Sequence, residues 1–545
     1  MRLLRLFSVL SLFIVLGSAK ILSYEELKDE PKSLVKDYYI NRLINEGSYT
    51  KEQIKELAKD VYRRAGPVQK SIDKILPPAP KPSLCPGVNP KNILDANITC
   101  QNALTTISFA LKLDIKTRTQ LATKLADFYP QKAQTLLILN DENPAVKFAQ
   151  NGDTKNFMAL FNASSISQTM KFFGTEFDAS FMDKFYQEKG FSALLNDVVI
   201  NKKYDAFRQN LLKIDENITE KNDAFMLGIN AITLKNDTAA LKFFAKAKAS
   251  FEREWQRDNA TFWLYLISKD EIYLNELAQS SDVNIYSLYA RDFTNAESFE
   301  VIVPRPSKEK PENFDVTDPF LWVKTAALAK QMNAEQASEY AKRFYTKESV
   351  GAYAYFMQRA AGWDKHYFLM PESLELEDTN VTRKSMIYAL GRQESLFIPS
   401  LISTSYALGM MQFMPFLANT IGKKELKIEN FDQDDMFKQD VAFKFANYHL
   451  DYLEKFLFHP LFIAYAYNGG IGFTKKLITR DDMFKEGIYE PFLSMELVPV
   501  TETRNYGKKV LANYVVYSAL MGSNIKISQL FEILSSPSAT DKFRK

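Results

Sequence analysis

Apolar side chains recur at spacings of three and four along most of the chain, which is the pattern of amphipathic α-helices. Between residues 88 and 303 these helical segments are short and are separated by Asn, Asp and Gly. Strand-like alternation is rare, and β-hairpin signals are absent. Helices of about ten to fifteen residues are too short to be stable alone. We therefore expect an all-α protein in which such helices stack as an α-solenoid.

Two neighbouring segments illustrate the pattern. Residues 222–234 place Phe225 and Ile229 on one face, and we expect Asp223 to cap that helix. Residues 236–250 follow the same design. Since no strict period connects the segments, no named repeat family is indicated.

Two proline-containing segments interrupt the helical pattern, at residues 76–87 and 303–319. Beyond residue 366, Gly, Tyr and Met become prominent and turn sequences appear. The predicted parts are a signal peptide at 1–19, an N-terminal helical segment at 20–76, a Pro-rich linker at 77–87, a stacked-helix domain at 88–303, a linker helical domain at 312–365 and a C-terminal domain at 366–545.

The N-terminus has the order of a secretory signal. Arg2 and Arg5 precede an apolar run, and the run ends in small residues up to Ala19. The run is short for a membrane span, although an uncleaved anchor is the alternative interpretation. No Cys follows it closely, so a lipid anchor is not indicated, and we expect an exported protein with no transmembrane span in the mature chain.

Composition argues against several classes of partner and cofactor. The formal charge is +3 over 545 residues and no basic block stands out, so no nucleic-acid partner is expected. The chain has three His and two Cys, which argues against a zinc or iron–sulfur site, and no metal is expected. No organic cofactor is implied.

The two cysteines form a candidate disulfide. Export permits a bridge between Cys85 and Cys100, which would close a loop of about fifteen residues and stabilise the fold by roughly 3 kcal/mol. A buried pair of free thiols is the alternative.

A carboxylate interrupts an apolar stripe in the last third of the chain. Ile387, Leu390, Glu394 and Phe397 follow each other at offsets of three, four and three, so they share one helix face. Loss of hydration should raise the pKa of such a carboxyl, which suits a general acid near neutral pH. A structural Glu that pairs with a buried Arg or caps backbone is the alternative.

No second acid is close to Glu394 along the chain. From Ser395 to Lys424 there is neither Asp nor Glu, whereas ordinary glycosidases use two carboxylates that flank the scissile bond. The pattern favours a reaction in which one group acts first as acid and then as base.

Five ordered features resemble the soluble lytic transglycosylases of bacterial cell-wall turnover. They are GRQES at 391–395, Ser403, ALGMMQFMP at 407–415, AYNGG at 466–470 and ETRNY at 502–506. The resemblance implies that residues 366–545 form a goose-lysozyme-like, mainly α catalytic domain. It also implies that the solenoid is that family's α-superhelical domain.

By this resemblance Glu394 is the single catalytic acid/base. It would cleave the β-1,4 bond between N-acetylmuramic acid and N-acetylglucosamine in peptidoglycan and yield a 1,6-anhydro product. The supporting substrate-binding residues would be Ser403, Gln412, Met414, Tyr467, Asn468 and Glu502. Ser403 is equally typical of a turn, Glu502 of a helix first turn, and the glycines after Asn468 of a helix C-cap.

The chain departs from the family pattern at two positions. Tyr406 stands where the family usually has Gly, and Met410 where it has Leu. A Tyr at this point would narrow the groove or stack on a sugar ring. Met410 and its neighbour Met411 are expected to pack in the core.

Three sequences of the form Asp-x-Asn-x-Thr resemble the acid-extended glycosylation sequon of bacteria that modify exported proteins. Their asparagines are Asn97, Asn217 and Asn380. Ordinary turn composition is the alternative.

The resemblance implies a periplasmic enzyme acting on peptidoglycan glycan strands, with other cell-wall enzymes as further candidate partners. Two other classes of function stay open. A muramidase-type hydrolase of the same fold would give reducing ends, and a non-catalytic scaffold would bind peptidoglycan without releasing fragments.

Overall fold

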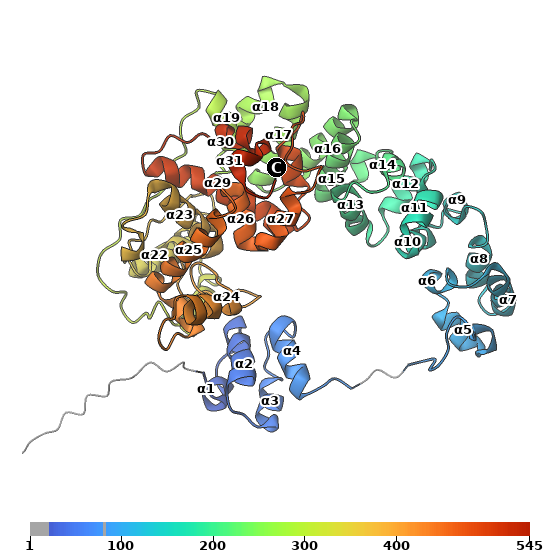
Figure 1. Cartoon of the computed structure of the whole chain (residues 1–545), viewed down its shortest axis with the longest axis horizontal. Coiled ribbons are helices and arrows are strands. Elements are labelled where there is room, and N and C mark those ends of the chain that lie inside the picture. Colours follow the sequence, from blue (N-terminus) through green and yellow to red (C-terminus); the bar gives the residue numbers. More distant parts are fainter. Residues whose placement is uncertain (1–20, 80–82, 545) are drawn as a thin grey trace, which may run out of the picture. The chain divides into compact units, whose positions relative to one another are not determined.

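The computed structural model describes residues 21–79 and 83–544, and it is built from helices (Figure 1). Within these ranges no β-strand forms, and pairing between extended segments is limited to isolated bridges such as Ile402 with Leu408. The expected all-α class is therefore confirmed. No helix in the described ranges has the length and apolarity needed to cross a bilayer. The predicted signal peptide at 1–19 lies outside the described residues.

The chain divides into two compact units. The first contains Met1–Ala79, Glu300–Lys455 and Val516–Ser523, and the second contains Pro80–Phe299, Phe456–Val515 and Asn524–Lys545. The C-terminal domain predicted at 366–545 thus contributes residues to both units.

The first unit begins with four helices that precede the Pro-rich segment. They are α1 (Tyr24–Lys28), α2 (Leu34–Glu46), α3 (Lys51–Leu57) and α4 (Gly66–Ile75). Its later helices are α20 (Pro319–Ala329), α21 (Ala334–Ala341), α22 (Val350–Ala360), α23 (Val381–Ser395), α24 (Pro415–Asn419) and α25 (Gln439–Glu454). A short 3₁₀ turn, η6 (Gln433–Phe437), precedes α25.

The second unit consists mainly of short helices that follow one another along the chain. They are α5 (Ile98–Leu104), α6 (Ile107–Ala110), α7 (Ile115–Leu125), α8 (Pro130–Ile138), α9 (Pro144–Gln150), α10 (Thr154–Ala163), α11 (Ile166–Phe173), α12 (Ala179–Tyr186), α13 (Phe191–Ile200), α14 (Asp205–Leu211), α15 (Lys221–Thr233), α16 (Asp237–Ser250), α17 (Glu254–Ser268), α18 (Glu271–Ala278) and α19 (Ile285–Phe293). It also holds α26 (Pro460–Gly469), α27 (Ile471–Ile478), α28 (Phe492–Glu496), α30 (Ile527–Glu532), α31 (Pro537–Thr540) and the start of α29 (Thr501–Leu520).

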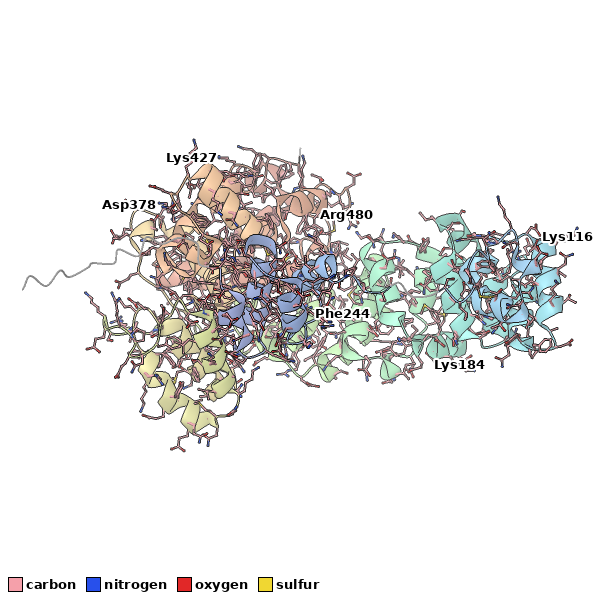
Figure 2. The ribbon with its side chains drawn as sticks, turned by 90° about the horizontal axis from the view of Figure 1, so that it is seen from below. Lys116, Lys184, Phe244, Asp378, Lys427 and Arg480 are labelled. Atoms are coloured by element: carbon pink, nitrogen blue, oxygen red, sulfur yellow. A yellow bond between two sulfur atoms is a disulfide. The ribbon has the colours of Figure 1, made fainter. Side chains whose placement is uncertain are left out.

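Successive helices of the second unit pack on each other, as a stacked-helix solenoid requires. From α15 to α19 each helix contacts the next (Figure 1). Phe244 of α16, labelled in Figure 2, is fully buried and stacks on Trp263 of α17 with ring centroids 5.4 Å apart. Gly228 of α15 allows this approach, because a Cβ there would lie 2.7 Å from the Phe244 ring. The expectation of stacked helices before the C-terminal motifs is confirmed.

The expected cap of α15 is wrong. The helix begins at Lys221, and Glu220 occupies the N-cap position. Asp223 instead lies inside the first turn, where it is buried and accepts a 2.7 Å hydrogen bond from the Ser192 hydroxyl. The Asp223 carboxylate therefore binds the Ser192 side chain of α13, whereas the sequence analysis expected it to cap the backbone of α15.

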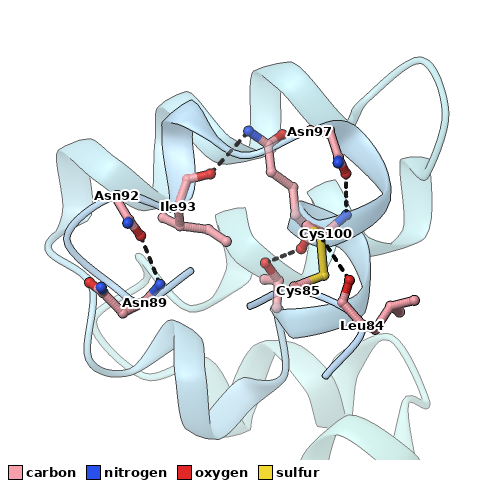
Figure 3. The surroundings of a disulfide bond; sticks show 9 residues. Leu84, Cys85, Asn89, Asn92, Ile93, Asn97 and Cys100 are labelled. Atoms are coloured by element: carbon pink, nitrogen blue, oxygen red, sulfur yellow. Dashed lines mark hydrogen bonds between the residues drawn. A yellow bond between two sulfur atoms is a disulfide. The ribbon is translucent and has the colours of Figure 1, made fainter. Parts of the chain in front are cut away.

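The two cysteines form a disulfide at the start of the second unit (Figure 3). The Cα atoms of Cys85 and Cys100 are 5.6 Å apart, and no free cysteine is present among the described residues. Asn97 accepts a 2.9 Å hydrogen bond from the Cys100 amide and thereby caps α5. The bridge joins a bend at Cys85 to a capped helix, and the predicted disulfide is confirmed.

Candidate active site

Helix α23 carries Glu394 in its last turn. Ile387 and Leu390 on the same stripe are fully buried, Phe397 beyond the helix end is 2% exposed, and Glu394 itself is half-buried. The apolar stripe is thus present as predicted, and the half-buried carboxylate lies between its apolar members Leu390 and Phe397.

The backbone after Glu394 turns sharply. Leu396 and Phe397 both have positive φ angles, of 54° and 60°, which ends the helix immediately after Ser395. Two glycines make room for this turn. A Cβ on Gly391 would meet the Phe397 ring at 2.6 Å, and a Cβ on Gly351 of α22 would meet the Phe397 carbonyl oxygen at 2.6 Å.

Ser395 connects the end of α23 to the segment that contains the next motif. Its hydroxyl donates a 2.8 Å hydrogen bond to the Met410 carbonyl oxygen and accepts one from the Ile398 amide at 3.2 Å. Because Ser395 is adjacent to Glu394, this bond fixes the catalytic candidate relative to residues 401–413. The sequence analysis assigned no role to Ser395, although this residue stands inside the GRQES motif.

Residues 401–413 form a tight loop, defined here as the motif loop. The Leu408 and Phe413 amides and carbonyls exchange two hydrogen bonds of 2.9 and 3.0 Å. Gly409 has φ +75°, and a Cβ there would lie 2.0 Å from the Met436 carbonyl oxygen of η6. Any side chain at 409 would therefore separate the motif loop from η6.

The three predicted substrate-binding residues of this unit lie on or next to the motif loop and are half-buried. Ser403 accepts hydrogen bonds from the Ser405 and Ala407 amides, so its hydroxyl organises the turn. The side-chain amide of Gln412 donates from Nε2 to the Leu401 and Gly409 carbonyl oxygens at 3.1 and 2.7 Å. Met414 is the residue before α24.

Tyr406 does not line an open groove, and the expectation that it stacks on a sugar is wrong. Its side chain is only 4% exposed, and its ring packs edge-on against Tyr38 of α2 at 5.7 Å. Its φ is +68°, a conformation that suits the family's usual Gly. The N-terminal helix α2 therefore covers the Tyr406 side chain, which the sequence analysis expected to face the groove. Met410 and Met411 are buried, as expected.

A buried polar cluster joins α2 to the start of η6. Arg42, 1% exposed, pairs with Asp432 at 2.7 Å and with Asp434 at 3.0 Å. The hydroxyls of Tyr38 and Tyr39 donate to the two carboxylate oxygens of Asp434 at 2.6 and 2.9 Å.

The pKa values of the two aspartates in this cluster shift in opposite directions. Burial raises the pKa of Asp434, despite Arg42 and the two tyrosines. Burial acts the same way on Asp432, but the hydrogen bonds from Arg42 and from the Asp434 amide, together with the charge of Arg42, outweigh it and lower that pKa. Nothing in the sequence pointed to this cluster, because its partners are separated by about 390 residues.

The other three predicted site residues belong to the second unit. Tyr467 is half-buried near the end of α26, and the Asn468 side-chain oxygen accepts a 2.6 Å hydrogen bond from the Thr503 hydroxyl. Gly470, with φ +87°, caps α26. Glu502 is exposed in the first turn of α29, where a carboxylate is favourable to the helix dipole.

The three sequon asparagines are exposed. Asn97 and Asn380 are N-caps of α5 and α23, and Asn217 lies in a short 3₁₀ turn, where its side-chain amide donates to Asp215. Their modification stays a prediction. In the part of the chain that the structure describes, no group of three or more His, Cys, Asp or Glu side chains is placed to hold a metal ion.

Comparisons with known proteins match this region of the chain. Residues 373–489 match the family model described as the Transglycosylase SLT domain. The match includes Glu394, Ser403, Gln412 and Tyr467 and ends before Glu502.

A soluble lytic murein transglycosylase of Salmonella typhimurium is 29% identical over 141 residues, which is 26% of this chain and 21% of that protein. Two solved structures have low similarity over most of the chain. An inactive mutant of the lytic transglycosylase Slt from Pseudomonas aeruginosa gives a TM-score of 0.46 at 12% identity, over 92% of this chain and 79% of that one. The 70 kDa soluble lytic transglycosylase from Escherichia coli gives 0.43 at 16% identity, over 93% and 88%. The chain therefore contains a Transglycosylase SLT domain at residues 373–489, and its resemblance to the soluble lytic transglycosylases is confirmed.

Proposed function

We propose that the protein is an exported lytic transglycosylase that cleaves the β-1,4 bond between N-acetylmuramic acid and N-acetylglucosamine in peptidoglycan. The observation that carries this proposal is the position of Glu394. It is a half-buried acid at the end of α23, tied through Ser395 to the motif loop, inside the Transglycosylase SLT domain.

Glu394 acts twice in the proposed reaction. As carboxylic acid it donates its proton to the glycosidic oxygen while the bond from that oxygen to C1 of N-acetylmuramic acid breaks. As carboxylate it then takes the proton of the C6 hydroxyl of the same sugar, and O6 bonds to C1. The 1,6-anhydro ring forms without water, and Glu394 regains its proton. Acid–base catalysis of this kind contributes about 10²–10⁴-fold.

The supporting residues have graded roles in the proposal. Ser403 and Gln412 shape the motif loop through their own hydrogen bonds and present their remaining polar atoms to the sugar. Met414 adds apolar surface. Tyr467, Asn468 and Glu502 are the further substrate-binding residues that the family resemblance implies. The site of action is the periplasm, and the ligand is the glycan strand.

The test is a purified Glu394→Gln variant on isolated cell-wall sacculi. The substitution keeps the size of the side chain and its capacity to form hydrogen bonds, but it removes the acidic proton that the reaction transfers. Release of soluble muropeptides should therefore fall at least ~100-fold. The thermal unfolding midpoint should stay within about 2 °C of wild type. Exposed Glu335→Gln on α21 is the matched control for loss of a carboxylate and should retain wild-type activity. Release at a near wild-type rate by Glu394→Gln would overturn the assignment.

A further inference from the structure

A pocket lies entirely within the second unit, between helices of the stacked-helix region and the start of α29. Its volume is about 390 Å³. Its lining comprises five side-chain amides, four large apolar side chains and three other polar residues: Asn196, Asn222, Gln256, Asn259, Asn505, Phe225, Met226, Phe251, Trp255, Glu496, Thr501 and Arg504. None of the predicted site residues is in this lining.

The buried charges in and next to the pocket lining sum to a surplus positive charge. Glu496, Arg504 and Lys508 are 3%, 6% and 7% exposed, and two of these three side chains are cationic. Glu496 is held by Lys508 at 2.5 Å and by the Tyr286 hydroxyl at 3.1 Å. A buried charge without a counterion is costly, so a binding partner of opposite charge is favoured.

Arg504 and Asn259 each keep an unused polar atom. Arg504 donates from Nε to the Val498 carbonyl oxygen at 2.9 Å and from Nη1 to the Met226 sulfur at 3.9 Å. Its Nη2 is buried and has no hydrogen-bond partner, and the same is true of the Asn259 Oδ1. Buried polar groups are normally paired, so a donor and an acceptor left open in one pocket lining indicate a missing ligand.

Trp255 forms an apolar wall of the pocket, and its side chain is half-buried. The Lys509 ammonium lies 5.7 Å from the centre of the Trp255 ring and adds a further positive charge next to this wall. Aromatic faces and side-chain amides together suit the neutral part of a ligand that has apolar faces and amide or hydroxyl groups.

We propose that this pocket binds a small carboxylate ligand, with Arg504 holding the carboxylate and with Trp255 and the surrounding amides holding its neutral part. Guanidinium groups pair with carboxylates through short, charge-assisted hydrogen bonds. Two peptidoglycan-derived groups carry this chemistry, the lactyl carboxylate of N-acetylmuramic acid and the free carboxylates of a stem peptide. Only this choice of probes rests on the proposed function.

The experiment is a ¹⁹F NMR titration of the full chain labelled with 5-fluorotryptophan. The chain has four Trp, and the Trp255 resonance is assigned as the one missing from a Trp255→Phe variant. N-acetylmuramic acid and L-alanyl-γ-D-glutamate are the two carboxylate probes, and N-acetylglucosamine is the neutral sugar that lacks the lactyl carboxylate.

At least one carboxylate probe should move the Trp255 resonance saturably, and the stronger of the two identifies the source of the carboxylate. N-acetylglucosamine should bind at least tenfold more weakly than that probe. Failure of both carboxylate probes to move the resonance, or equal binding of the neutral sugar, would overturn the proposal. Because no cleavage is measured, these results are independent of the role of Glu394.

Two variants test the charge of the pocket. Arg504→Gln should abolish the shift. Since that change could also unfold a buried cluster, Asn505→Asp places a negative charge on the half-buried pocket lining and should weaken binding at least tenfold. Asn275→Asp, the same change at an exposed position of α18, is the control. Unchanged affinity in Asn505→Asp would contradict the proposal.

Discussion

At the scale of single residues, His459 shows how one buried ring links stability to pH. It is 1% exposed at the start of α26, where its Nδ1 accepts from the Leu461 amide at 3.1 Å. Its Nε2 lies 2.9 Å from the Leu530 carbonyl oxygen and donates to it. Burial, with a contribution from Arg544, lowers the pKa of His459 to about 4.

The neutral ring is the form that the fold stabilises, so the contribution is complete above the unfolded pKa of about 6.5 and is lost as pH falls to about 4. The loss is on the order of 3 kcal/mol. We predict that His459→Gln flattens the decline in the free energy of unfolding between pH 6.5 and 4. Denaturant melts at several pH values measure this decline, and an unaltered slope in the variant would contradict the prediction.

At the scale of elements, α2 is held to η6 by buried charge. Arg42 is the shared partner of Asp432 and Asp434, so Arg42→Met leaves two largely buried carboxylates without a cation. Removing one partner of a buried ion pair costs about 3–5 kcal/mol. We predict a loss of this size in the free energy of unfolding, with reduced muropeptide release, because η6 contacts the motif loop at Gly409.

The exposed pair of Lys342 and Glu339 provides the control for Arg42→Met. Both side chains are at least 70% exposed, so Lys342→Met should change stability by less than about 1 kcal/mol. Equal effects of the two substitutions, measured in denaturant melts, would show that the α2–η6 cluster contributes no more to the free energy of unfolding than an exposed ion pair does.

The disulfide stabilises the first helices of the second unit. Fifteen residues separate its cysteines, and closing such a loop stabilises the folded state by about 3 kcal/mol. The double variant Cys85→Ala, Cys100→Ala should lower the free energy of unfolding by that amount, and reducing agent should have a comparable effect on wild type only. A reducing-agent effect of the same size in the double variant would rule out the bridge as its cause.

Local patterns predicted the elements better than they predicted contacts between them. The helical periodicity and the stripe through Ile387, Leu390 and Phe397 are present because they depend on neighbours three and four residues away. Tyr406 and Asp223 were misplaced because α2 and α13, distant in sequence, determine their surroundings. The Arg42 cluster was missed for the same reason.

At the scale of the whole molecule, the residues that the family resemblance assigns to the site are divided between the two compact units in the sequence. Glu394, Ser403, Gln412 and Met414 belong to the first unit, and Tyr467, Asn468 and Glu502 to the second. The sequence motifs could propose the whole set because chain order, rather than spatial position, carries the family resemblance. The pocket around Arg504 had no such motif to reveal it.

The mass of the products released from sacculi tests the central claim most directly. If the C6 hydroxyl attacks C1, fragments released by the wild-type enzyme end in 1,6-anhydro-N-acetylmuramic acid and are one water lighter than hydrolysis products. Chemical reduction with borohydride should leave these ends unchanged. Fragments that carry reducing ends and gain hydrogen on reduction would contradict the transglycosylase account and establish a hydrolase in its place.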